Sequence, residues 1–388
     1  MPTHTLFVRL LALCLVFGSL VACKDEENPL TITPQLRQQV AYTKLTDTTT
    51  YATFFVDNNG AKTVDLTTGN NRLLMFRAIN TYLGTAAGTG AALDATVLKN
   101  MFSNTASPFS GTANTGLNTA GVQLRNVTAS SFSATDAEKE RQTIEAAFPA
   151  IANASKSVSA VASEGKAGKL GTYLVDEKGI EWGQIIQKSL IGAFQLDYIS
   201  NVLLSDARLS ADNTTLVAGN NYTQLEQNWD EAFGILTTNG AYGGKTTATS
   251  SGESFIGSYL WEYNREDFPK LHKALLTGRA AIVNNDTKTL NEQATFIRAA
   301  MEKAIANAAL GYLGKWKTGT TDAARAHAIG EGLGFIYGLR YAKLNKGDAA
   351  FSDSILNNLV YSAPTGFWAL TNAKIDAATT AIKTKFNL

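Results

Sequence analysis

The feature that most constrains this chain is a series of segments, from residue 179 to residue 385, in which apolar residues recur at helical spacing. Such spacing predicts amphipathic helices, each with one face directed toward a core. The predicted helices are 179–205, 221–236, 266–283, 290–314, 321–345, 350–361 and 365–385. Several long helices with short breaks predict a mainly α protein, built as one helical bundle or as two bundles with a boundary at about 210–250.

Residues 46–68 carry a different pattern from these helices. Thr50–Val56 is rich in β-branched and aromatic residues, and Asp57-Asn58-Asn59-Gly60 has the composition of a turn. Together they predict a small N-terminal β-hairpin. Residues 103–133 are rich in Ser, Thr, Asn and Gly, which predicts a long loop.

The N-terminus has the pattern of a secretory signal. Arg9 precedes an apolar run, Leu10–Val21, that is too short to cross a bilayer. The run ends in Leu20-Val21-Ala22-Cys23, which resembles a bacterial lipobox. We therefore expect a signal peptide at 1–22, cleavage before Cys23, and attachment of lipid to Cys23.

The residues after Cys23 refine the expected location. The cluster Lys24–Glu27 resembles the export signal of Bacteroidetes lipoproteins that reach the outer face of the outer membrane. The alternative is an ordinary charged tether on the periplasmic face. Residues 23–45 contain few large apolar residues and are interpreted as the tether, with the helical domain at 46–388. No later apolar run approaches the length of a transmembrane helix.

Composition excludes some classes of partner. Of 34 Lys and Arg residues only Arg9 precedes residue 23, so 33 remain against 33 Asp and Glu. This balance argues against a nucleic-acid binder. The two cysteines are Cys14, which would leave with the signal, and Cys23, which would carry lipid, so we expect no disulfide.

Two predicted helices carry candidate ligand residues. His327 and Glu331 are one turn apart on one helix, and Glu226 and Asp230 have the same spacing on another, where Glu231 is adjacent. If the two helices face each other, four carboxylates and an imidazole converge, a set that suits iron, manganese or zinc. The alternative for His327 and Glu331 is a structural hydrogen bond.

Motifs of common hydrolases are missing from the sequence. There is no His-Glu-x-x-His and no Gly-x-Ser-x-Gly. We therefore assign no catalytic residue and expect a binding protein rather than an enzyme. A metal-dependent hydrolase that uses Glu231 as its acid or base is the less favoured alternative. The glycines of the 321–345 helix are interpreted as sites of close helix packing.

A set of short segments resembles a known family of Bacteroidetes lipoproteins, domain of unknown function 4856, over about residues 46–385. The segments that carry the resemblance are Tyr222–Glu226, Trp229–Gly234, Asn71–Met75, Leu98–Phe102, Gly179–Glu181 with Gln184, Asp212–Thr214, Gly278–Ile282 and His327–Phe335. That family is similar to the imelysin-like proteins, which are helical bundles associated with iron acquisition.

The resemblance implies an imelysin-like bundle that serves as a binding component of iron or haem uptake. Its expected partners are the lipid anchor and an outer-membrane receptor or transporter, and its implied cofactor is iron or another divalent metal. The chain departs from the pattern, because it lacks the Gly-x-His-x-x-Glu motif and carries Gln227 and Asn228 where relatives have histidines. A structural or adhesive partner of a transporter is the alternative.

Overall fold

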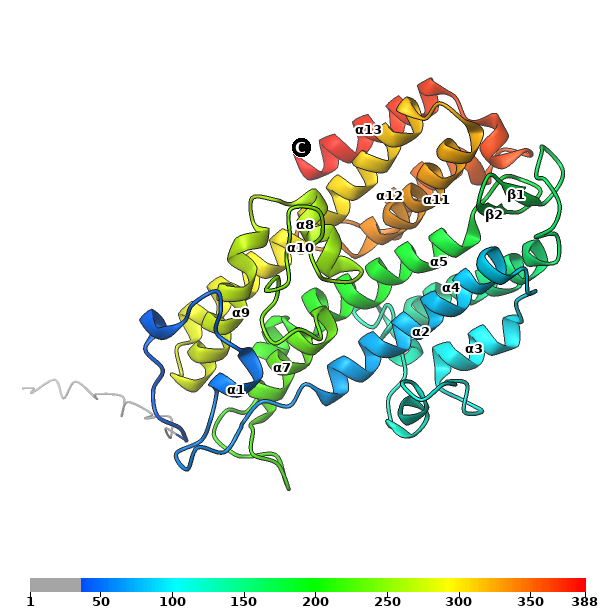
Figure 1. Cartoon of the computed structure of the whole chain (residues 1–388). Helices are drawn as coiled ribbons and strands as arrows, with labels where there is room; N and C mark the ends of the chain where they lie inside the picture. Colours follow the sequence, from blue (N-terminus) through cyan, green and yellow to red (C-terminus); the bar gives the residue numbers. More distant parts are fainter. Residues whose placement is uncertain (1–35) are drawn as a thin grey trace, which may run out of the picture. The chain divides into compact units, whose positions relative to one another are not determined.

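The computed structural model describes residues 36–388 (Figure 1). The predicted signal peptide, Cys23 and the first part of the predicted tether lie outside the described residues. The described part is mainly helical, with one small antiparallel sheet. No helix within it is both long enough and apolar enough to cross a membrane.

The helices and strands follow in chain order. The α-helices are α1 (Tyr51–Phe54), α2 (Thr67–Thr89), α3 (Ala95–Ser103), α4 (Ala134–Ser155), α5 (Trp182–Leu190), α6 (Asp206–Leu209), α7 (Gln224–Leu236), α8 (Ile256–Tyr263), α9 (Phe268–Val283), α10 (Thr287–Thr318), α11 (Asp322–Gly338), α12 (Ala349–Leu356) and α13 (Asn372–Phe386). The strands are β1 (Gly168–Leu170) and β2 (Tyr173–Val175). The π-helices are η4 (Ile191–Leu203) and η6 (Asn357–Tyr361), and the 3₁₀ turns are η1 (Tyr42–Lys44), η2 (Thr115–Thr119), η3 (Arg125–Val127), η5 (Leu339–Tyr341) and η7 (Gly366–Ala369).

The helices pack around one continuous apolar core that extends from Leu45 to Phe386. Helix α10 contacts α8, α9, α11 and α13, while α11 also packs against α5, and α2 packs against α7. Both α7 and α11 contact η4, which continues directly from α5. The helical architecture expected from the apolar periodicity is therefore confirmed.

Glycines set the contact between α11 and the α5–η4 helix. Gly330, Gly334 and Gly338 are spaced by four residues and lie on one face of α11. A Cβ atom at Gly334 would lie 3.0 Å from the Ile185 carbonyl oxygen, and one at Gly338 would lie 3.3 Å from the Gly192 Cα. The two backbones thus approach each other more closely than larger residues permit, which confirms the packing interpretation of these glycines.

The position of the hairpin differs from the prediction. The strand-like run from Thr50 contains the short helix α1, and only an isolated bridge joins Val56 to Lys62. Tyr51 and Phe55 are four residues apart, so a helical turn directs both rings into the core, where each is at most 2% exposed. The two-stranded sheet lies instead at β1 and β2, which pair antiparallel.

Two further segments differ from the prediction made from the sequence. Residues 36–45, assigned to the tether by sequence, pack on the helical domain, because Arg37 and Leu45 are 5% and 2% exposed. Helix α8 lies between two predicted segments and was not predicted. Residues 103–133 form the expected long loop, which contains only the short turns η2 and η3.

Candidate functional site

The carboxylates predicted on α7 are buried in ion pairs. Thr223 caps the helix and forms a reciprocal capping box with Glu226, which fixes the first turn. Glu226 accepts hydrogen bonds from Arg37, at 2.7 Å, and from Arg279 of α9, at 2.8 Å. Asp230, one turn later, accepts from Arg279 at 2.9 Å and from the Tyr51 hydroxyl at 2.8 Å. One buried guanidinium therefore bridges both carboxylates.

The pKa values of Asp230 and Glu226 shift in opposite directions at this buried site. Burial raises the pKa of Asp230 to about 6, although Arg279 and Tyr51 favour its ionised form. Burial acts in the same direction on Glu226, but Arg279 and Arg37 outweigh it and lower the pKa of that carboxyl. The Asp230 Oδ2 atom is buried without a hydrogen-bond partner among residues 36–388.

Glu231 is adjacent in sequence but points elsewhere. It pairs with Arg72 of α2, and burial raises the pKa of its carboxyl. All three carboxylates of α7 are thus neutralised by arginines from the N-terminal segment, α2 and α9. This arrangement compensates the buried charges of α7 and leaves the carboxylates engaged with arginines, rather than open to another cation.

His327 and Glu331 form a second, separate cluster. The His327 ring lies between two carboxylates, with Nδ1 2.8 Å from Glu181 and Nε2 3.1 Å from Glu331. It also stacks on the Tyr173 ring of β2, with 4.0 Å between the ring centroids. Glu331 in addition accepts from the Tyr259 hydroxyl at 2.9 Å and lies 3.4 Å from the Lys188 ammonium.

The electrostatics of this cluster favour a protonated His327 and an ionised Glu331. Burial alone would lower the pKa of His327, but hydrogen bonds to Glu181 and Glu331 raise it to about 9. Burial would raise the pKa of Glu331, yet His327 and Lys188 lower it to about 2. At neutral pH both ring nitrogens of a protonated imidazole donate to carboxylates, so neither is available to a metal ion.

The structure does not bring the two predicted sets of ligands into one site. Glu226, Asp230 and Glu231 have arginine partners, whereas His327 and Glu331 have Glu181, Lys188 and Tyr259. Both α7 and α11 pack against η4, the continuation of α5. In the described part of the chain, no group of three or more His, Cys, Asp or Glu side chains is arranged to hold a metal ion.

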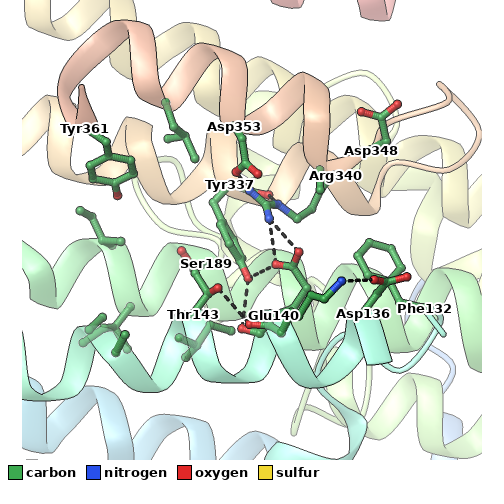
Figure 2. Close-up of a pocket in the computed structure, with 18 of the residues that line it drawn as sticks. Phe132, Asp136, Glu140, Thr143, Ser189, Tyr337, Arg340, Asp348, Asp353 and Tyr361 are labelled. Carbon is green, nitrogen blue, oxygen red and sulfur yellow. Dashed lines mark hydrogen bonds and ion pairs between the residues drawn. The ribbon is translucent and has the colours of Figure 1, made fainter. Parts of the chain in front are cut away.

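A large cavity lies elsewhere, between α4, α5, α11 and α12 (Figure 2). Its volume is about 960 Å³. Its walls are formed by Phe132, Asp136, Lys139, Glu140, Thr143, Ile144, Ala146, Ala147, Trp182, Ile185, Ile186, Ser189, Tyr337, Arg340, Lys343, Asp348, Ala349, Ala350, Asp353, Leu356 and Tyr361. A cavity of this size, lined by apolar and aromatic groups together with polar and charged ones, can hold a small molecule.

A buried ion pair crosses the cavity wall. The Arg340 guanidinium donates to both oxygens of Glu140 at 2.8 Å, and it also donates to Asp353 at 2.5 Å. The Tyr337 hydroxyl donates to Glu140 at 2.5 Å, and burial raises the pKa of that hydroxyl well above its usual value. Each member of this network is satisfied, so it holds α4, α11 and α12 together around the cavity.

The cavity is polar at one end and apolar at the other. Helices α4 and α5 run antiparallel. A Cβ at Gly183, at the start of α5, would meet Ile151 near the end of α4, while Ala129, before α4, donates its N–H to the carbonyl of Ala193, after α5. The charged residues at the start of α4 therefore lie near the end of α5, while Ala147 lies near Trp182. Figure 2 places Tyr361 on one side and the labelled charged groups toward the other.

Sequence reasoning did not identify this cavity. One available signal was Glu140, which falls four residues before Ile144 and so shares one face of a helix with that apolar residue. Another was the pair Tyr337 and Arg340, an aromatic and a cation at helical spacing in an otherwise small and apolar segment. A buried charge of this kind requires a partner, and the partner of Arg340 is 200 residues away.

Comparison with known proteins identifies a family. No curated protein and no solved structure matches the chain. The family described as Domain of unknown function (DUF4856) matches over residues 51–388, which includes every helix described above. The chain therefore belongs to the DUF4856 family.

Proposed function

We propose that this protein is a lipid-anchored binding protein of the outer membrane, exposed at the cell surface, that holds a small molecule in the cavity between α4, α5, α11 and α12. The observation that carries the proposal is the cavity itself. Its volume of about 960 Å³ lies at the upper end of the range for ligand sites, about 300–1,000 Å³. Its aromatic walls and convergent polar groups supply both contact area and orientation.

The wider role that we propose is a binding component of iron or haem acquisition, partnered by an outer-membrane receptor or transporter. Support comes from the lipobox before Cys23 and from the resemblance to Bacteroidetes lipoproteins and imelysin-like proteins. Since the acidic residues of α7 and the His327 cluster are engaged internally, iron would enter as a porphyrin or an organic chelate. Such a ligand is held through its organic part.

Titration of the full mature chain with haem, protoporphyrin, a ferric chelate and bare Fe(II), Mn(II) and Zn(II) tests the proposal. Trp182 lines the cavity, so its fluorescence reports occupancy. Ala146 is exposed and lines the cavity, whereas Ala150, one turn later on α4, does not. We expect Ala146→Trp to weaken binding at least about tenfold, with Ala150→Trp as the matched control. The absence of saturable binding, or equal binding by both variants, would remove the site.

The anchor is tested separately. Replacement of Cys23 by Ala is expected to move the protein from the membrane fraction to the soluble fraction of the envelope. Protease added to intact cells then distinguishes the two faces of the membrane, because only a surface-exposed protein is cleaved. Protection from protease would assign the protein to the periplasmic face.

A further inference from the structure

One cation at the polar end of the cavity has no carboxylate partner. Lys343 follows η5 and lines the cavity at its rim, where it is exposed. Its ammonium lies over the Phe132 ring, 4.0 Å from the centroid. The structure records no ion pair for Lys343 with any residue in 36–388. An aromatic face stabilises a cation without supplying an anionic partner in direct contact.

The other charged groups at this end are already paired. Lys139 lies 3.0 Å from Asp136, and Arg340 is saturated by Glu140 and Asp353. Asp348 also lines the cavity, but its carboxylate caps α12 by accepting from the Phe351 N–H at 2.7 Å. Lys343 is therefore the cation of the cavity wall that remains available to an external anion.

Partial burial of the Lys343 amine strengthens its attraction for an anion. It lowers the pKa of the Lys343 amine, although Asp197, Asp348, Glu302 and Glu140 act in the opposite direction from a distance. A partly desolvated ammonium gains more from an anion than a fully hydrated one does, because the local dielectric constant is lower.

A second polar group points to a ligand deeper in the cavity. Ser189 of α5 is 4% exposed, yet its hydroxyl has no hydrogen-bond partner in the described part of the chain. The hydroxyl lines the cavity and can donate a hydrogen bond to an oxygen or nitrogen of a bound molecule. Beyond it the walls are apolar and include Trp182, Ile185 and Leu356.

The next inference rests on the proposed function. We propose that the ligand is an amphipathic organic anion. Its carboxylate or equivalent acidic group pairs with Lys343 at the rim. An oxygen of the same molecule accepts a hydrogen bond from the Ser189 hydroxyl. Its hydrocarbon or ring body packs against the apolar end, near Trp182.

Matched amphipaths test this inference on the full mature chain. Decanoate, decanol and decylammonium share one alkyl chain and differ in the charge of the polar group. We expect decanoate to bind about fivefold more tightly than decanol and decylammonium to bind most weakly, a ratio typical of one partly exposed ion pair. Calorimetry below the micellar concentration measures all three affinities.

Two variants test whether Lys343 causes the preference for decanoate over decanol. Lys343→Gln should bring decanoate and decanol within about twofold of each other. Lys139→Gln removes a cation of the same wall that is already paired, so it should leave the preference intact. Equal affinity of decanoate and decanol for the native chain would overturn the inference, as would a preference that survives in Lys343→Gln.

The outcomes separate this inference from the function on which it rests. Saturable binding of haem, decanol or decylammonium that Ala146→Trp blocks, without a preference for the anion, would overturn only the ligand class. The absence of binding by every compound, haem included, would overturn the proposed function as well.

Discussion

At the residue scale, the folding stability of this protein depends on buried ionisable side chains. Arg279 is fully buried and compensates the charges of Glu226 and Asp230. A buried pair adds little net stability compared with apolar residues, because desolvation offsets the attraction. Its loss is nevertheless costly, since Arg279→Met would leave the buried Asp230 without a cation and Glu226 with Arg37 alone, at about 3–5 kcal/mol.

His327 makes folding stability depend on pH. Its pKa rises from 6.5 to about 9 on folding, so the folded state binds the proton more tightly. The resulting stabilisation is complete below about pH 6.5 and is lost as the pH rises through 9. After allowance for the 26% exposure of the side chain, we expect a loss of about 2 kcal/mol over this range. Urea unfolding at several pH values should show the loss in the native chain and not in His327→Gln.

His272→Gln is the control for that measurement. Burial lowers the pKa of His272, so its contribution to the pH dependence has the opposite sign to that of His327 and lies at lower pH. The variant should therefore keep the native pH profile between 6.5 and 9. Superimposable profiles of the native chain and His327→Gln would show that the imidazole does not carry the effect.

The sequence indicated part of these clusters. Spacing of four residues placed Glu226 with Asp230 and His327 with Glu331, and the contact between His327 and Glu331 is present. The partners were not predictable, because Arg37 is 189 residues from Glu226 and Glu181 is 146 residues from His327. Helical periodicity reports neighbours on one helix and carries no information about which distant segment packs against it.

At the scale of elements, the glycines of α11 decide how closely two helices approach. A Cβ at Gly334 would overlap Lys188 and lie 3.1 Å from the Ser189 backbone nitrogen, whereas one at Gly314 of α10 would meet nothing within 4 Å. We expect Gly334→Ala to destabilise the fold by about 2 kcal/mol through overpacking, and Gly314→Ala to stabilise it by about 0.5–1 kcal/mol. Thermal unfolding distinguishes the two signs, and a shift in the same direction for both would contradict the packing argument.

Local propensity was least reliable where tertiary packing opposed it. Thr50–Val56 has strand composition, but the burial of Tyr51 and Phe55 on one face requires a helical turn. The predicted helix 179–205 is continuous in the structure, yet its second half is the π-helix η4, which apolar spacing does not distinguish from an α-helix. Helix α8 is only eight residues long, too short for a clear periodic signal.

At the scale of the whole molecule, contacts cross the boundary that the sequence suggested near residues 210–250. Helix α2 packs against α7, and η4 packs against α7, α10 and α11. The segment that begins at residue 36 is joined to α7 and α9 through Arg37, Tyr51 and their buried partners. The described residues, 36–388, group as one compact unit with a shared core.

Such a shared core predicts one cooperative unfolding transition. Arg279→Met acts on the α7–α9 side, and Gly334→Ala acts on the α5–α11 side. If the helices unfold together, each variant should lower the midpoint of the same transition, and the calorimetric and van't Hoff enthalpies should agree. Circular dichroism at 222 nm and tryptophan fluorescence should then report coincident curves. Two resolved transitions, each shifted by only one of the variants, would instead establish two bundles that unfold independently.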